Sequence, residues 1–106
     1  MSKPLKIQIV ELARALIADE QHWCRDHLAV DKNGIAVSPM SPRAVKRCAV
    51  GAVISAAYQL TNDVDTARKL GYESLAPIGS FLFMQVNDAG GHFAVLALFD
   101  KIIAAS

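Results

Sequence analysis

The sequence has 106 residues, of which 53% are hydrophobic and 20% are charged. A chain of this length can bury an apolar core of its own, so we predict a single domain over residues 1–106. The formal net charge is +1, which gives the protein no overall attraction to nucleic acid or to membranes. The longest apolar run, from Cys48 to Ile54, is much shorter than the roughly 20 residues that a membrane-spanning helix needs.

The N-terminal segment does not have the pattern of a signal peptide, because Gln8, Glu11 and Arg14 interrupt its apolar residues. We therefore expect a cytoplasmic protein that makes no membrane contact. The two cysteines, Cys24 and Cys48, are expected to be thiols in that compartment.

The predicted elements begin with an amphipathic helix from Leu5 to about Asp19. Its apolar residues recur at helical spacing, and Pro4 is tolerated at its start. The helix could instead continue through Trp23 to Leu28. In both cases the pattern predicts that Trp23, the only tryptophan, packs in the core.

A turn and a long apolar helix follow. Asn33-Gly34 is a strong signal for a hairpin or tight loop, because both residues tolerate positive φ angles. A serine-proline pair then has the pattern of an N-cap and first helical position, so we predict a second helix from about Pro42 to Leu60. Its middle is apolar on nearly all sides, which predicts that it is central. Gly51 in this helix indicates close approach by a neighbouring helix.

A short third helix is predicted directly after the second. Its N-cap could be Thr61, Asn62 or Asp63, since all three residue types favour this position. We expect the helix to end at Gly71, because glycine is common at the C-terminal end of a helix.

The C-terminal part contains one ambiguous segment and one clear helix. Residues 80–86 could form a short buried helix or a strand, and periodicity leaves both open. A turn through Asn87 and Asp88 leads into a last helix from about His92 to Ala104. Together the elements predict an all-α fold, a compact bundle of four to five helices around the central apolar helix with one short hairpin-like loop.

Several short motifs follow one another along the chain: W-C at Trp23, P-R-A-V at Pro42, C-A-x-G-A at Cys48, N-D at Asn87 and V-L-A-L-F-D at Val95. Their order resembles a family of small bacterial and phage proteins with no assigned activity. The chain has Val86 where that family usually has a tryptophan. The resemblance implies a helical fold and a phage-associated context.

The stretch HWCRDHLA, residues 22–29, contains candidate metal ligands. On a helix Cys24 and His27 would share a face. Cys48 and His92 would complete a Cys₂His₂ set, which is a ligand set that zinc prefers. The spacing matches no standard zinc motif, so we predict that no metal is bound.

The same stretch contains a candidate nucleophile. Cys24 with His92 and either Asn87 or Asp88 would supply the residue types of a cysteine-dependent active site. The chain carries no signature of such an enzyme, so we predict no catalytic residues. Asn87 and Asp88 are expected to bond to nearby backbone amides and stabilise their turn. With His92 they form a candidate polar site.

Three basic residues, Arg43, Lys46 and Arg47, fall in the first turns of the predicted second helix. Cations at this end oppose the helix dipole, which favours anions there. We therefore expect their charge to be offset by an acidic neighbour such as Asp31, by a bound phosphate or by an acidic partner. These three residues are our candidates for binding a partner or an anion.

These patterns favour a non-catalytic interaction module over an enzyme. The phage-associated context adds the expectation of an accessory protein that binds a host protein complex and modulates or inhibits it. A protein is the first expected partner, and nucleic acid or phosphate bound through the basic residues is the alternative. A small cysteine- or zinc-dependent enzyme is the third hypothesis. We expect no cofactor, and a homodimer stays open.

Overall fold

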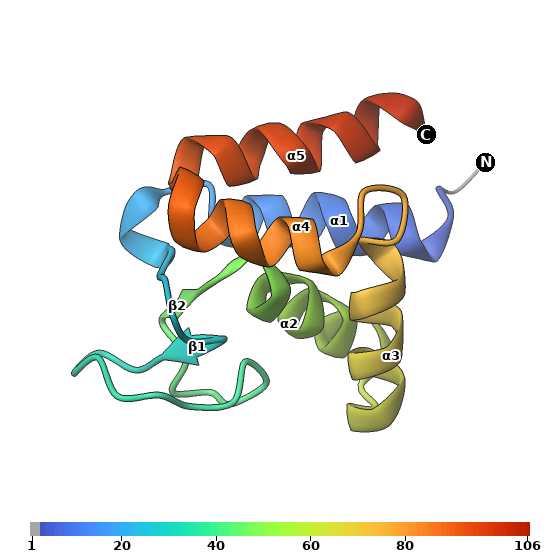
Figure 1. The fold of residues 1–106 in the computed structure, drawn as a ribbon. Coiled ribbons are helices and arrows are strands. Elements are labelled where there is room, and N and C mark those ends of the chain that lie inside the picture. Colours follow the sequence, from blue (N-terminus) through green and yellow to red (C-terminus); the bar gives the residue numbers. More distant parts are fainter. Residues whose placement is uncertain (1–2) are drawn as a thin grey trace.

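Five α-helices account for most of residues 3–106, the part of the chain that the computed structural model describes. They are α1 (Leu5–Leu16), α2 (Ala49–Thr61), α3 (Val64–Ser74), α4 (Ser80–Gln85) and α5 (His92–Ala105). Two short strands, β1 (Ala29–Val30) and β2 (Lys46–Arg47), pair as an antiparallel sheet. The all-α bundle predicted from the sequence is confirmed (Figure 1).

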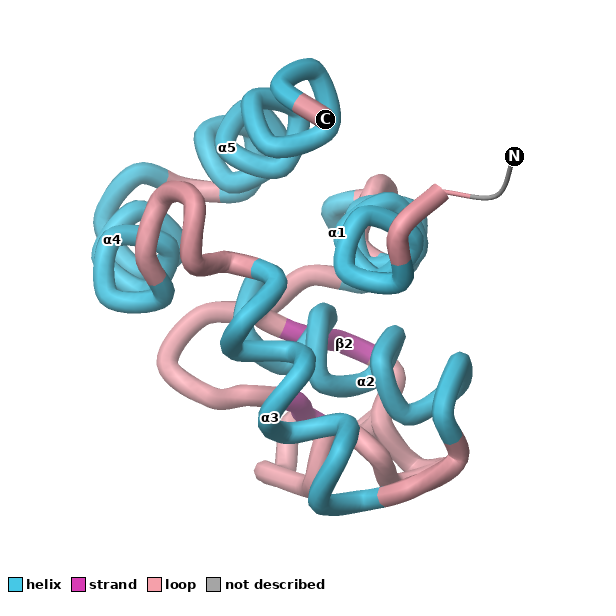
Figure 2. The backbone as a smooth tube through the Cα atoms, turned by 90° about the vertical axis from the view of Figure 1, so that its right-hand side faces the viewer, coloured by secondary structure: helices cyan, strands magenta, loops and turns pink. Residues whose placement is uncertain are grey.

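Helix α2 is the centre of the bundle, as its apolar sequence predicted. Every residue from Ala49 to Ala57 is buried, and the helix packs against α1, α3 and α4. Helix α1 lies between α2 and α5 (Figures 1 and 2). Phe83 of α4 and Phe99 of α5 are both fully buried, and their ring centroids lie 5.1 Å apart. These two rings hold the C-terminal helices on the core.

Helix α2 begins at Ala49, so the predicted start at Pro42 is wrong. The segment before Ala49 is extended instead, because β2 pairs with β1. The Val45 N–H also donates to the Val30 carbonyl at 2.9 Å. Pairing between segments far apart in the sequence therefore overrides the local signal for a helix start.

Helix α1 ends at Leu16, earlier than expected, and does not continue to Trp23. Asp19 caps a separate 3-10 turn over Glu20–His22, and its side chain accepts a hydrogen bond from the Gln21 N–H at 2.9 Å. The chain therefore reaches Trp23 in an extended conformation, and HWCRDHLA is a loop rather than a helix.

Helix α3 begins at Val64, and of the three N-cap candidates it is Asp63 that caps the helix. The Asp63 carboxylate accepts from the Thr66 N–H at 2.9 Å. The predicted end at Gly71 is wrong, because the helix continues to Ser74. A Cβ on Gly71 would lie 3.1 Å from the backbone of Ile54, so this glycine lets α3 pack closely on α2.

The ambiguous segment after residue 80 is helical. Helix α4 continues into η2 (Val86–Gly90), a single π-helical turn. The turn predicted through Asn87 and Asp88 is this π turn. Gly91 follows with φ +95° and is the N-cap residue of α5. A π turn inside a helical segment is uncommon and often accompanies a functional site.

The predicted hairpin-like loop is formed at Asn33-Gly34. Gly34 has φ +80°, and its N–H donates to the Asp31 carbonyl at 3.0 Å. Val30 and Ala36 form a bridge across the loop.

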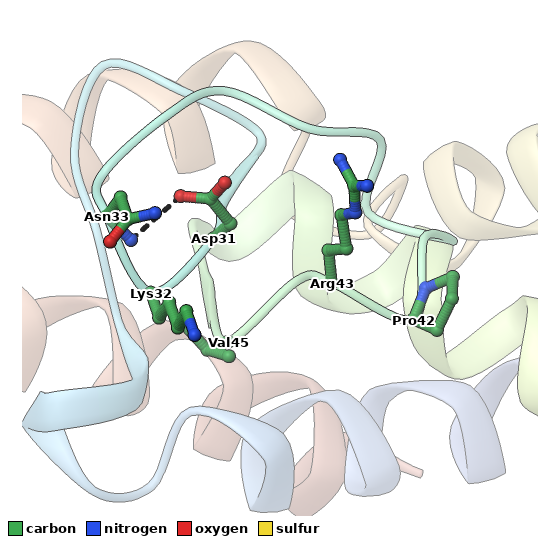
Figure 3. A pocket seen from close by; sticks show the side chains of 6 residues that line it. All are labelled: Asp31, Lys32, Asn33, Pro42, Arg43 and Val45. Atoms are coloured by element: carbon green, nitrogen blue, oxygen red, sulfur yellow. Dashed lines mark hydrogen bonds between the residues drawn. The ribbon is translucent and has the colours of Figure 1, made fainter.

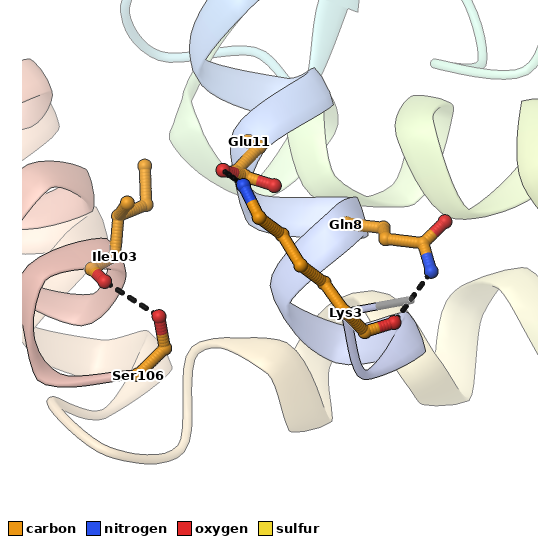
Figure 4. Close-up of polar contacts among 5 residues, drawn as sticks. All are labelled: Lys3, Gln8, Glu11, Ile103 and Ser106. Atoms are coloured by element: carbon orange, nitrogen blue, oxygen red, sulfur yellow. Dashed lines mark hydrogen bonds and ion pairs between the residues drawn. The ribbon is translucent and has the colours of Figure 1, made fainter. Parts of the chain in front are cut away.

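Polar contacts lie near each end of the chain, and each contact joins residues that are close in the sequence (Figure 4). The Lys3 Nζ pairs with Glu11 Oε2 at 2.6 Å, and the Ser106 Oγ donates to the Ile103 carbonyl at 2.6 Å. No helix within residues 3–106 has both the length and the apolar character needed to cross a membrane.

Candidate functional site

The Asn87 side chain, only 2% exposed, joins three segments of the chain. Its Oδ1 accepts hydrogen bonds from the Trp23 Nε1–H at 2.8 Å and from the Ala49 N–H at 2.9 Å. Its Nδ2 donates to the Cys24 carbonyl at 3.1 Å. This Asn87 network brings together the W-C, C-A-x-G-A and N-D motifs. The sequence placed Asn87 in a polar turn but did not indicate that its partners are distant in the chain.

Trp23 is 9% exposed, which confirms its predicted burial. Its ring centroid lies 5.6 Å from that of His92, and the Arg25 guanidinium lies over the ring at 5.2 Å. The His92 Nε2–H donates to the Ile17 carbonyl at 2.6 Å, since a carbonyl can only accept. His92 is therefore engaged with the backbone at the end of α1.

The Cys24 thiol is not activated. Its Sγ donates to the His27 carbonyl at 3.5 Å. Burial, together with the neighbouring Cys48 thiol, raises the pKa of Cys24 to about 11. A protonated thiol is a poor nucleophile, and His92 is occupied elsewhere. The cysteine–histidine arrangement considered from the sequence is not formed.

The Cys48 thiol has a structural role at the start of α2. Its Sγ accepts from the Gly51 N–H at 3.3 Å and so caps the helix. Burial raises the pKa of this thiol, and the negative charge of Asp88 adds to that effect. Within the described residues no group of three or more His, Cys, Asp or Glu side chains is placed to hold a metal. Cys24, His27, Cys48 and His92 thus do not converge as a Cys₂His₂ site.

A cavity of about 170 Å³ lies beside the Asn87 network. Two exposed aspartates, Asp26 and Asp88, are among the residues that line it, and we call it the acidic-rimmed cavity. The Asp88 Oδ1 accepts from the Asp26 N–H at 3.3 Å, and Asp26 has φ +67°. Asp26 is therefore in contact with the π turn. The cavity is lined by Asp26, His27, Leu28, Cys48, Val50, Met84, Asn87 and Asp88.

The three candidate basic residues do not lie at a helix start. Arg43 is exposed in a turn and lies with Lys32 beside an open hollow of about 490 Å³ (Figure 3). Lys46 is exposed on β2, and the neighbouring Arg47 is half-buried. The Arg47 Nη2 donates to the Ala44 carbonyl at 3.4 Å, and burial lowers the pKa of its guanidinium. The predicted cluster on the first turns of a helix is therefore wrong.

Asp31 is not the acidic neighbour that the sequence suggested for these cations. Its Oδ1 accepts from the backbone N–H groups of Asn33 at 2.8 Å and Ile35 at 3.0 Å. The carboxylate thus stabilises the hairpin-like loop. The ion pairs within residues 3–106 involve none of the three candidate basic residues.

Sequence reasoning missed four exposed apolar side chains on α4 and at the start of α5. Phe93 is 85% exposed and Phe81 is 68% exposed. Leu82 and Met84 of α4 are also exposed. We call these four side chains the α4–α5 surface. The apolar composition indicated that such a patch could exist, but only the packing of α5 on α1 shows which side chains are left outside.

Comparison with known proteins gives one match. The model of a family described as a family of unknown function, DUF6197, matches residues 1–105. The chain belongs to this family. Membership in DUF6197 confirms the resemblance to a family without an assigned activity, and the match covers every element of the fold. No curated protein and no solved structure matches the chain.

Proposed function

We propose that the protein is a non-catalytic module that binds another protein through the α4–α5 surface. The observation that carries this proposal is the exposure of Phe93 and Phe81, at 85% and 68%. Burying one such side chain contributes roughly 1.5–3 kcal/mol. Aromatic side chains are also enriched at the centres of protein interfaces.

The distribution of charge on α5 supports the same function. The helix has only two charged residues, Asp100 and Lys101, and both lie in its C-terminal half. The Asp100 carboxylate is paired with Arg14 of α1 at 2.6 Å. The N-terminal half of α5, which contains Phe93, therefore carries no formal charge when His92 is neutral. This agrees with an interface, because charged residues are depleted in the core of interfaces.

The polar groups near the site support binding rather than catalysis. Asn87, His92 and Cys24 all bond to groups of the protein itself. The partner that we propose is a bacterial host protein or complex, which this protein would modulate or inhibit. That part of the proposal is supported by the resemblance to phage proteins.

The test is capture of partners from a lysate of the native host by matched variants. Phe81→Ser with Phe93→Ser removes the two most exposed rings of the α4–α5 surface. Ile35→Ser is the control, because Ile35 is 61% exposed but lies in the hairpin-like loop. All three substitutions should change the free energy of unfolding by less than about 0.5 kcal/mol, since the side chains are exposed.

We expect one protein to be captured by the wild type and by the Ile35 control and to be lost with the double variant. Capture of the same proteins by all three would contradict the proposal.

A further inference from the structure

The α4–α5 surface continues into the acidic-rimmed cavity. Met84 belongs to both, because it is exposed on α4 and lines the cavity. Phe81 lies three residues before Met84, so the two share a face of the helix. A partner that covers α4 therefore also meets the mouth of the cavity.

Two acidic residues line the cavity. Asp26 and Asp88 are both exposed, and neither takes part in an ion pair within residues 3–106. Hydrogen bonds from the Asp26 N–H and the Asn87 Nδ2, both at 3.3 Å, hold the Asp88 Oδ1 in place.

The Arg25 side chain, a cation close to Asp88, is held in another role. The Arg25 guanidinium lies over the Trp23 ring, and its Nη1 donates to the backbone carbonyl of Asp88 at 3.1 Å rather than to the carboxylate. Leu28, Val50 and Met84 help to give the cavity an almost wholly apolar wall. The exposed Asp26 and Asp88 lie beside this wall.

We propose that the acidic-rimmed cavity receives a lysine or arginine side chain of a protein partner whose flanking apolar residues cover Phe81 and Met84. The alkyl stem would pack on the apolar wall, and the cationic head would meet Asp26 and Asp88. A volume of about 170 Å³ suits one side chain, whereas sites for drug-sized ligands measure about 300–1,000 Å³. This inference rests on the proposed function and names the chemistry of its partner.

The test is selection of peptides from a displayed library of random 12-residue sequences. The target is the full chain, either as the wild type or as Asp26→Asn with Asp88→Asn. Asparagine keeps the shape and the acceptor oxygen of both residues and tolerates the positive φ of position 26, so the fold should be retained. Asp26→Asn alone is the second variant, should the double variant be unstable. Asp65→Asn, on the exposed face of α3, is the control for loss of a negative charge.

We expect the wild type and the Asp65 control to enrich peptides with one basic residue next to apolar residues. The best such peptide should bind the double variant at least tenfold more weakly. Three outcomes would each overturn the inference. The selection could enrich peptides without a basic residue, it could enrich acidic peptides, or it could enrich no peptide because a second copy of the chain covers the surface.

A separate variant distinguishes this inference from the proposed function. If selected peptides bind Phe81→Ser with Phe93→Ser as tightly as the wild type, the proposed function fails. If they depend on the two phenylalanines but not on the two aspartates, only the basic anchor is refuted.

Discussion

Replacing Asn87 by alanine tests the network that joins three segments of the fold. The substitution leaves three groups without their partner: the Trp23 Nε1–H, the Ala49 N–H and the Cys24 carbonyl. Asn87 is 2% exposed, and the Ala49 N–H bond to it is also buried. The effect of the substitution is therefore the cost of desolvated polar groups that have lost their hydrogen bonds.

The magnitude follows from the number of these groups. A buried donor or acceptor left without a partner costs about 1–3 kcal/mol. Water that enters through the adjacent cavity can satisfy part of this demand. We therefore expect Asn87→Ala to lower the free energy of unfolding by about 3–5 kcal/mol. Small domains have about 5–15 kcal/mol in total, so this loss is large.

Urea denaturation followed by tryptophan fluorescence and by circular dichroism gives the change in unfolding free energy. Asn33→Ala is the matched control, because Asn33 is an exposed asparagine whose substitution should cost less than about 0.5 kcal/mol. A loss below about 1 kcal/mol for Asn87→Ala, or one equal to that of the control, would refute the role of the network.

Three further predictions concern the helix start, the thiol and the basic residues. Gly51→Ala should lower the free energy of unfolding by about 3 kcal/mol, because a Cβ would lie 1.8 Å from the Leu28 carbonyl oxygen. Helix propensity alone would favour alanine by about 1 kcal/mol. A variant that thermal or urea unfolding shows to be stabilised would contradict this contact. Iodoacetamide should alkylate Cys24 about 100-fold more slowly at pH 7.5 than an ordinary thiol, because the pKa of Cys24 is raised to about 11. The alkylation rate should keep rising with pH until the pH reaches this pKa. A rate that levels off near pH 9 would count against the buried thiol. Arg43→Gln with Lys46→Gln should change stability by less than about 0.5 kcal/mol, whereas a clear gain in Tm would support the helix start at Pro42 that the structure rules out.

Elements with strong local signals could be predicted from the sequence. The last helix, the Asp63 cap of α3 and the Asn33-Gly34 loop all agree with the structure, because each depends on residues close together in the chain. The start of α2 could not be predicted in this way. Ser41 and Pro42 form a capped turn, but the pairing of β1 with β2 holds the next residues extended.

The candidate site could be predicted only in part. Asn87 was identified as a polar turn residue, but its hydrogen-bond partners Trp23, Cys24 and Ala49 lie 64, 63 and 38 residues away. No local pattern reports such contacts. The exposure of Phe93 was equally hidden, since an apolar helix is normally buried and only the packing of α5 on α1 shows which side faces outward.

The most direct test of the proposed function places a photo-reactive benzoylphenylalanine at position 93. Light should cross-link the protein, in a lysate of the cells in which it occurs naturally, to one partner, and the same partner should be cross-linked from position 81. The same amino acid at position 35, which is also exposed but lies in the hairpin-like loop, should give no such product. Equal cross-linking from position 35, or no product from positions 81 and 93, would contradict binding through the α4–α5 surface.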